Sequence, residues 1–175
     1  MTKMTSVEAA KLLRKLNEEL DAIIRKEAQS KDFLAALGED PESVRPKYDY
    51  SGTSRQIDGL EARIRQLKHA INLFNTTTAV PEIGMTVDQA LVYIPQLTKR
   101  CEKLRDMMNK FPKTRETAAG FGRGSALIDY RYLNYDAAEV EADYREAKRE
   151  LDTAQLQLDL INSTAELSVD DSVLG

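Results

Sequence analysis

The chain has 175 residues, of which 31% are charged, 42% are hydrophobic and only 6% are aromatic. A chain of this length can bury a substantial core as one domain, and this composition is typical of a helical protein rather than a β-sandwich or a disordered segment. The net charge of −4 argues against a dedicated nucleic-acid binder, although a local basic patch can exist on a mildly acidic protein. The single cysteine excludes an intramolecular disulfide.

The hydrophobic residues form neither a signal-peptide pattern nor a membrane-spanning pattern. The first residues contain no apolar core of a signal peptide, and no run of about 18 apolar residues occurs in the sequence. The sequence therefore predicts neither secretion nor membrane spanning, and we expect a cytoplasmic protein.

Capping patterns mark the expected starts of four helices. In each pattern Thr or Asp is followed three residues later by Glu or Gln, so that the two side chains can satisfy backbone amides reciprocally. The pairs are Thr5 with Glu8, Thr53 with Gln56, Thr86 with Gln89 and Asp136 with Glu139. An apolar heptad run follows each pair, which predicts helices over about residues 6–37, 54–75, 87–111 and 137–167.

Heptad seams give these helices one apolar stripe each. The second helix has the strictest seam, with spacings of three and four and no polar interruption: Ile57, Leu60, Ile64, Leu67, Ile71 and Phe74. The seam of the third helix includes Cys101 and continues to Phe111, and Pro95 predicts a kink or a late start near Ile94. Gly38 is the expected end of the first helix.

Two tyrosine-rich linkers read as strands, over about residues 47–51 and 128–135. In an up-down-up-down bundle they lie at the same end, where Tyr48 and Tyr50 would face Tyr130 and Tyr132. The predicted fold is mainly α, a four-helix antiparallel bundle of coiled-coil hairpins with a small two-stranded β-ribbon at one end. We expect a single helical domain over residues 1–175, with a flexible loop at 112–126 and a disordered tail at 168–175.

Several runs of the sequence carry a family resemblance. They are Ile71-Asn-Leu-Phe-Asn-Thr-Thr-Thr, Thr86-Val-Asp-Gln-Ala-Leu, Ile128-Asp-Tyr-Arg-Tyr and Asn162-Ser-Thr-Ala-Glu-Leu. Over about residues 6–167 the chain resembles the septicolysin-like family of small bacterial helical proteins. The resemblance implies an all-helical, hairpin-rich fold with a small β element in a bacterial or phage context. It implies little about activity, and Pro95 and the loop from Pro112 to Ala126 depart from the short form of that family.

Reactive side chains are few and scattered. The only histidine, His69, falls outside its helix seam, and Cys101 occupies a seam position where it serves as a small apolar filler. The carboxylate pairs Glu102 with Asp106 and Glu146 with Glu150 are typical of a solvated helix face. We therefore expect no catalytic residue, no cofactor and no metal.

The segment from Pro112 to Ala126 is the most irregular part of the sequence. Its Lys113, Arg115 and Arg123, together with Phe121, could contact a phosphate backbone or a protein partner. The alternative is a solvated connector, because no helix directly follows the glycines as a phosphate-binding loop would require. The tyrosines of the two linkers also have two possible roles, which are packing within the ribbon and binding a partner.

Self-association is the sharpest functional prediction of the heptads. Helices of this length leave apolar edges, so we expect seam residues of the first and fourth helices to meet a second copy: Leu13, Leu20, Leu151 and Leu158. The leading hypothesis is a non-enzymatic oligomeric helical protein, a scaffold or interaction module. The alternatives are a membrane-active, haemolysin-like protein, which the family name suggests, and nucleic-acid binding through residues 113–123.

Overall fold

The computed structural model describes residues 1–116 and 129–174. The chain is mainly helical with small antiparallel strand pairs, and it divides into two compact units where the sequence predicted a single domain. The first unit comprises Met1–Ala79, Thr86–Asp88 and Asp159–Gly175, and the second comprises Val80–Met85 and Gln89–Leu158.

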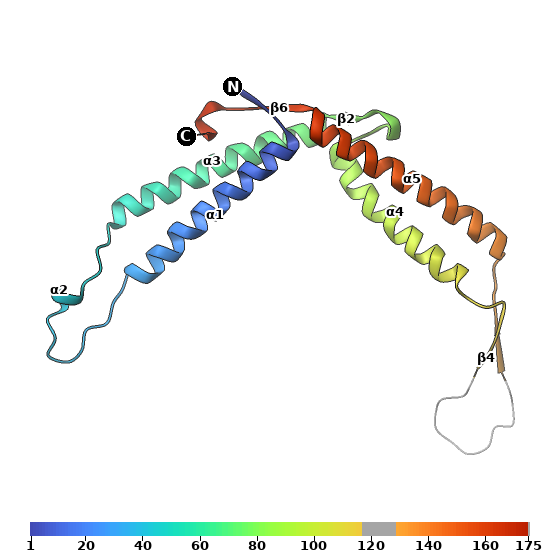
Figure 1. Cartoon of the computed structure of the whole chain (residues 1–175), viewed down its shortest axis with the longest axis horizontal. Coiled ribbons are helices and arrows are strands. Elements are labelled where there is room, and N and C mark those ends of the chain that lie inside the picture. Colours follow the sequence, from blue (N-terminus) through green and yellow to red (C-terminus); the bar gives the residue numbers. More distant parts are fainter. Residues whose placement is uncertain (117–128, 175) are drawn as a thin grey trace, which may run out of the picture. The chain divides into compact units, whose positions relative to one another are not determined.

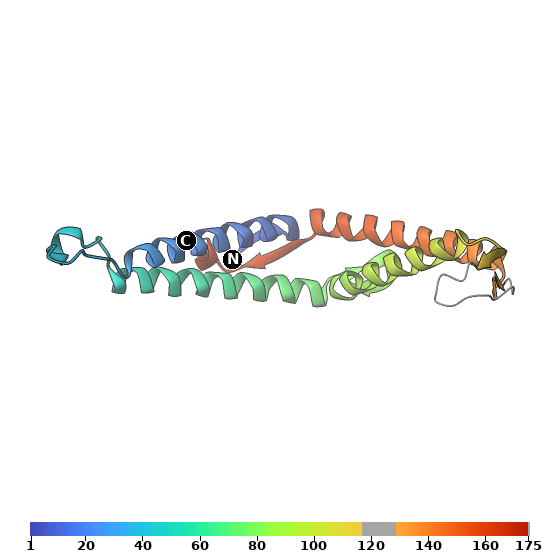
Figure 2. The same ribbon diagram turned by 90° about the horizontal axis from the view of Figure 1, so that it is seen from below.

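Two long helices form the first unit. Helices α1 (Ser6–Ser30) and α3 (Tyr50–Thr77) lie side by side as a hairpin (Figures 1 and 2). The heptad seam of α3 faces inward as predicted, because apolar side chains at these spacings share one side of the helix. The buried residues of the pair are Ala9, Leu16, Leu60, Ile64, Leu67 and Phe74.

The two ends of the chain pack on this hairpin. Strand β1 (Thr2–Thr5) pairs antiparallel with β6 (Glu166–Val169), so that Thr2 lies opposite Val169. The 3₁₀ turn η2 (Asp171–Val173) follows, and its Val173 is fully buried. The Arg63 Nε donates to the Val173 carbonyl at 2.9 Å, and the terminal amine lies 2.6 Å from Asp171. The prediction of a disordered tail is therefore wrong, because alternate apolar residues of β6 are buried.

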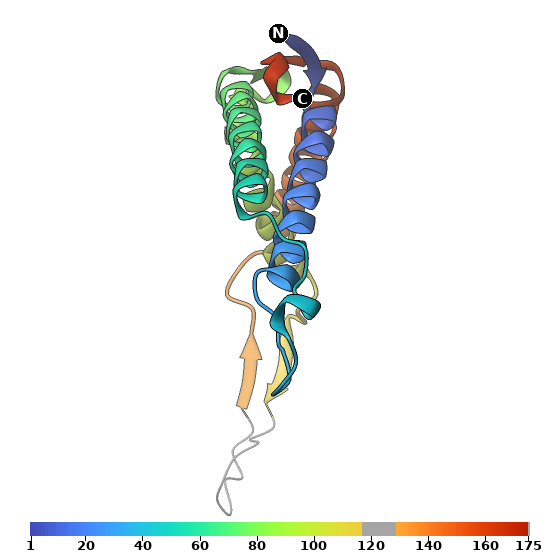
Figure 3. The ribbon, with the colours of Figure 1, turned by 90° about the vertical axis from the view of Figure 1, so that its left-hand side faces the viewer.

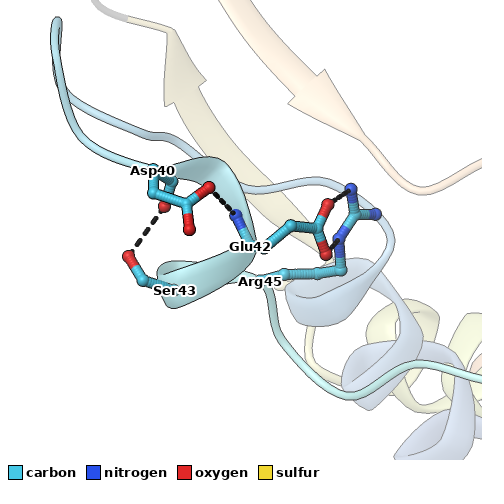
Figure 4. A network of polar contacts seen from close by, with 4 residues as sticks. All are labelled: Asp40, Glu42, Ser43 and Arg45. Carbon is cyan, nitrogen blue, oxygen red and sulfur yellow. Dashed lines mark hydrogen bonds and ion pairs between the residues drawn. The ribbon is translucent and has the colours of Figure 1, made fainter.

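The segment between α1 and α3 corrects two predicted boundaries. Helix α1 ends at Ser30 and not near residue 37, leaving Leu34 and Leu37 exposed. A separate turn, α2 (Pro41–Val44), follows, in which Asp40 caps the amide of Glu42 and Arg45 binds both carboxylate oxygens of Glu42 (Figure 4). These local contacts compete with helix continuation, because a capped turn fixes the backbone in a different path.

The start of α3 is also earlier than predicted. Asp49 caps it by accepting from the Gly52 amide at 3.0 Å, so Thr53 lies inside the helix and is not its cap. Asp is as good a cap as Thr, and the pattern Thr53/Gln56 could not discriminate between the two starts. At α1 the predicted capping box is confirmed, since Glu8 N donates to Thr5 and Thr5 N donates to Glu8.

The second unit has its own core between two further helices. Helices α4 (Val87–Met108) and α5 (Ala137–Thr164) supply it: Leu97, Cys101, Leu104, Val140, Ala147, Leu151 and Ala154. The start of α5 agrees with its predicted cap, because Asp136 accepts from the Ala138 amide at 2.7 Å. Helix α4 runs through Pro95 from Val87, so the predicted late start is wrong, and it ends at Met108 instead of Phe111.

A short hairpin joins α3 to α4. It consists of β2 (Ala79–Val80), the 3₁₀ turn η1 (Pro81–Ile83) and β3 (Met85–Thr86). Gly84 has a φ of +63°, a left-handed conformation that favours glycine and lets the chain turn back here. Helix α5 ends at Thr164, and the chain continues directly into β6 rather than remaining helical to residue 167.

Candidate interaction site

A ribbon of two strands extends from the ends of α4 and α5. Strands β4 (Lys113–Glu116) and β5 (Asp129–Tyr132) pair antiparallel, with Lys113 opposite Tyr132 and Arg115 opposite Tyr130 (Figure 3). The predicted partner was residues 47–51, and that pairing is wrong. Tyr48 precedes the cap of α3 and Tyr50 is the first residue of that helix, so both belong to the first unit.

One face of this ribbon combines two sets of residues that the sequence treated separately. Because side chains alternate along a strand and opposite residues share a face, Lys113, Arg115, Tyr130 and Tyr132 lie together. We call them the cationic–aromatic face. The Lys113 Nζ lies 4.1 Å from the centre of the Tyr130 ring and 5.4 Å from that of Tyr132. These contacts hold the ammonium over two aromatic rings.

The other face of the ribbon is electrostatically paired. Arg131 forms an ion pair with Glu116 across the strands, and Thr114 and Asp129 complete this face. In contrast, Lys113 and Arg115 have no carboxylate within ion-pair distance among residues 1–116 and 129–174. The positive charge of the ribbon is therefore unneutralised on the cationic–aromatic face.

None of the ribbon residues contributes to a core. All residues of β4 and β5 are exposed, and Tyr132 keeps 61% of its surface. A two-stranded hairpin without a packed face is only marginally stable in water. The ribbon is thus a surface whose apolar and cationic groups are available to a partner.

One backbone hydrogen bond continues the ladder of the ribbon at its base, and one side-chain contact joins the base to α4. The Leu133 amide donates to the Pro112 carbonyl at 3.3 Å, and the Tyr135 hydroxyl donates to the Met107 carbonyl at 2.8 Å. A hollow of about 430 Å³ opens here. Its lining includes Phe111, Thr114, Arg131, Tyr132, Leu133 and Tyr135. Phe111 is 75% exposed, because α4 ends before the seam position that the heptad assigned to it.

Half of the predicted self-association seam is buried within the chain. Leu151 and Leu158 are buried, with 7% and 8% of their surface exposed, and Leu13 and Leu20 are half-buried. Leu151 packs with Leu97 and Cys101 in the second core. Buried side chains cannot meet a second copy, so the prediction is wrong for the two residues of α5.

Exposed leucines lie on another side of α5, which the heptad analysis missed. Leu156 and Leu160 are one turn apart and keep 67% and 50% of their surface. Their spacing of four in the sequence is the signal that could have identified them, but they fall outside the a/d seam and so received no role.

The single histidine and the single cysteine lie in different helices, α3 and α4. His69, outside the seam of its helix, is exposed, and Cys101, at a seam position, is buried, as predicted. Phe121 and Arg123 lie outside the described residues. Within the described ranges, no group of three or more His, Cys, Asp or Glu side chains is placed to hold a metal ion, and no helix there is long and apolar enough to cross a membrane.

A polar contact in the first unit was also missed. The Tyr48 hydroxyl donates to Glu27 Oε1 at 2.5 Å, tying the return segment to the last turns of α1. Accepting this hydrogen bond, Glu27 raises the pKa of Tyr48 to about 12, and burial of the phenol acts in the same direction. A hollow of about 290 Å³ lies beside this pair, lined among others by Lys26, Lys47 and Gln56. The hydrogen bond between Tyr48 and Glu27 holds the segment before α3 against the end of α1.

Comparison with known proteins gives a structural relative. No protein-family model and no curated protein matches the chain. A solved structure described as a functionally unknown conserved protein from Corynebacterium diphtheriae is similar, with a TM-score of 0.59 and 19% sequence identity. The match covers 95% of this chain and 100% of that one. At this identity the similarity extends to the fold alone.

Proposed function

We propose that this chain is a non-enzymatic interaction module, in which the helical hairpins act as a scaffold and the β4–β5 ribbon recruits a partner. The observation that carries the proposal is the cationic–aromatic face, where Lys113, Arg115, Tyr130 and Tyr132 are exposed together on an element that buries no core. Tyrosine and arginine are enriched among the residues that dominate binding energy at protein interfaces.

The cationic–aromatic face fixes the position of Lys113 before a partner binds. Lys113 is already held over two rings, so part of its rotamer entropy is lost before a partner arrives. Each exposed cation–π contact contributes about 0.5–1 kcal/mol. An anionic partner would then meet a cation whose position is set in advance.

Affinity capture with the full-length chain tests this function. A double variant, Lys113→Glu with Arg115→Glu, removes the positive charge, and Lys99→Glu on the exposed side of α4 is the matched control. The proposal expects a defined partner that binds the wild type and the control but is lost with the double variant. Equal recovery by all three proteins would contradict it.

Self-association is the second part of the proposal, and Leu156 and Leu160 support it. Two exposed leucines one turn apart form an apolar stripe on α5 that a second copy could cover with the same stripe. Helix pairs of two copies would then form a four-helix bundle between chains, in place of the bundle that the heptads predict within one chain.

Light scattering coupled to size-exclusion chromatography measures this directly. The wild type should run as a defined multimer, and Leu156→Lys with Leu160→Lys should reduce it to a monomer. Gln155→Lys, on a neighbouring exposed position of the same helix, should leave the mass unchanged. A monomeric wild type at high concentration would reject self-association while leaving the ribbon proposal intact.

A single-stranded nucleic acid is a second candidate partner. Bases stack on exposed tyrosines and phosphates pair with Lys and Arg, so the same face could serve it. Binding of this kind should weaken steeply with salt, because phosphate contacts release counterions. Oligothymidylate binding that is insensitive to salt, or absent, would exclude it.

We also propose membership of the septicolysin-like family, from the sequence runs at residues 71–78, 86–91, 128–132 and 162–167, and the membrane activity that the family name suggests. Dye release from anionic liposomes tests the first, and vesicles that stay intact at micromolar protein would exclude it. A multimer in solution would support a role as a scaffold, whereas a monomer would support a role as a simple adaptor.

A further inference from the structure

The hydrogen-bonding register of the ribbon determines which backbone groups are free. The Leu133 amide bonds the Pro112 carbonyl, so these opposite residues form a hydrogen-bonded pair. Such pairs alternate along an antiparallel ladder with non-hydrogen-bonded pairs. Counting from Pro112, Thr114 and Glu116 bond toward β5, whereas the N–H and C=O groups of Lys113 and Arg115 point to the outer edge of β4.

The outer edge of β4 therefore carries a specific combination of groups. Within the described residues β4 pairs with β5 alone, so this edge has free donors and acceptors. The two residues that offer them, Lys113 and Arg115, are also the two unneutralised cations of the cationic–aromatic face. An added strand would place alternate side chains directly opposite these cations, at the distance where opposite charges stabilise a sheet.

The residue between the cations sets a third requirement. Thr114 points to the other face of the ribbon, where it lines the hollow together with Phe111 and Arg131. A partner residue opposite Thr114 projects to that face as well. The lining includes several aromatic and aliphatic side chains, which favours an apolar residue at this position.

We propose that β4 binds an extended segment of another protein with an acidic–apolar–acidic sequence, which adds antiparallel as a third strand with its acids opposite Lys113 and Arg115. The inference rests on the proposed function and names the chemistry of the partner. Strand addition of this kind derives affinity from main-chain hydrogen bonds and specificity from alternate side chains.

The charges favour the outer edge of β4 over that of β5, and a segment of another protein over a second copy of this chain. The outer edge of β5 presents the backbone of Tyr130 and Tyr132, which carry no charge to select a partner. A second copy does not provide the segment, because its acidic–apolar–acidic runs at residues 19–21, 139–141, 141–143 and 150–152 lie inside α1 and α5. All four runs are helical, and the middle residues Val140 and Leu151 are also buried.

Fluorescence anisotropy with the full-length chain tests the proposal. The probe is a labelled peptide with the core Thr-Glu-Val-Glu-Thr, and the control has the same composition in the order Thr-Glu-Glu-Val-Thr. Both have the same charge, but only the first places both acids on one face of a strand. We expect the alternating peptide to bind about ten-fold more tightly, since two cross-strand ion pairs are gained.

Charge exchange separates recognition from loss of folding. Lys113→Glu with Arg115→Glu should abolish binding of the acidic peptide and create binding of Thr-Lys-Val-Lys-Thr. Lys99→Glu should change neither. Rescue by the exchanged peptide shows that the ribbon of the variant is intact, whereas binding that survives the double substitution would overturn the proposal.

Backbone methylation tests strand addition itself. In the antiparallel register the glutamate amides of the peptide point to β4, so N-methylation of one glutamate should weaken binding at least ten-fold, while N-methylation of the valine should be tolerated. Equal tolerance of both would overturn strand addition. Equal affinity for the two peptide orders, with capture of a partner still dependent on Lys113 and Arg115, would refute this inference but leave the proposed function standing. Tighter binding of oligothymidylate than of either peptide would assign the face to nucleic acid instead.

Discussion

The two helical hairpins of this chain are built from similar heptads but finish their helices differently. In the first, residues 31–49 are fastened by Tyr48 to Glu27, by Arg45 to Glu42 and by Arg45 over the Phe33 ring at 5.2 Å. In the second, the segment beyond α4 forms a ribbon that has no core contacts of its own. The apolar seams determine that each pair of helices forms a hairpin. The contacts at the helix ends determine whether the connecting segment is held by side-chain contacts, as residues 31–49 are, or is exposed, as β4 and β5 are.

The largest expected effect separates the two cores. Leu67→Ala should destabilise the first unit by about 2–5 kcal/mol, because Leu67 is fully buried and its loss leaves a cavity. Hydrogen exchange should show lost protection in α1 and α3, whereas Leu97→Ala should act on α4 and α5. Equal loss of protection in all four helices after either substitution would mean that the units unfold as one.

A smaller effect is expected at the C-terminal strand. Val169→Ala should cost about 2 kcal/mol, since Val169 is 1% exposed in β6 and its methyl groups lose their contacts. Ser168→Ala, at the exposed neighbouring position, is the control and should be neutral. Urea unfolding followed by circular dichroism measures both, and a neutral Val169→Ala would contradict the packing of this strand.

The Tyr48–Glu27 contact gives the first hairpin a pH dependence. A pKa raised from 10.0 to about 12 means that the neutral phenol is favoured in the folded chain. The stabilising contribution is complete below pH 10 and is lost as the pH rises through about 12. Tyrosinate absorbance should show that Tyr48→Phe removes the latest-titrating phenol and that Glu27→Gln lowers the pKa of Tyr48. An unchanged titration in Glu27→Gln would refute the contact.

The smallest effect is expected on the ribbon. Tyr130→Ser and Tyr132→Ser should each change the free energy of unfolding by no more than about 1 kcal/mol, because both side chains are exposed, support no core and lose only a cation–π contact with Lys113. The same substitutions should weaken partner binding. A large loss of stability measured by thermal unfolding would show that the ribbon has a structural role and would count against its use as a docking surface.

Local sequence patterns predicted much of the helical part of the molecule. The seam of α3, the capping box at Thr5 and the cap at Asp136 all correspond to observed contacts, because each depends on residues within one or two turns. The exposure of Lys113, Arg115, Tyr130 and Tyr132 could also be inferred from their polarity. That they share one face could not, because the two strands are distant in the sequence.

Competing local signals explain the boundaries that were missed. Asp49 and Thr53 are both acceptable caps, and only the path of the preceding segment selects Asp49. The heptad continues to Leu37, yet α1 stops at Ser30, where the returning chain brings Tyr48 against Glu27. Such long-range contacts leave no periodic trace in the sequence.

The amino-acid sequence alone determined that this protein is helical, where most helices begin and which residues line their seams, because apolar periodicity and capping act over a few residues. Tertiary structure decided the division into two units, the burial of Leu151 and Leu158, the packing of the C-terminal strand and the pairing of β4 with β5. These features depend on which helix and strand surfaces pack together. An apolar seam shows that a helix must pack against another apolar surface, but it does not identify that surface.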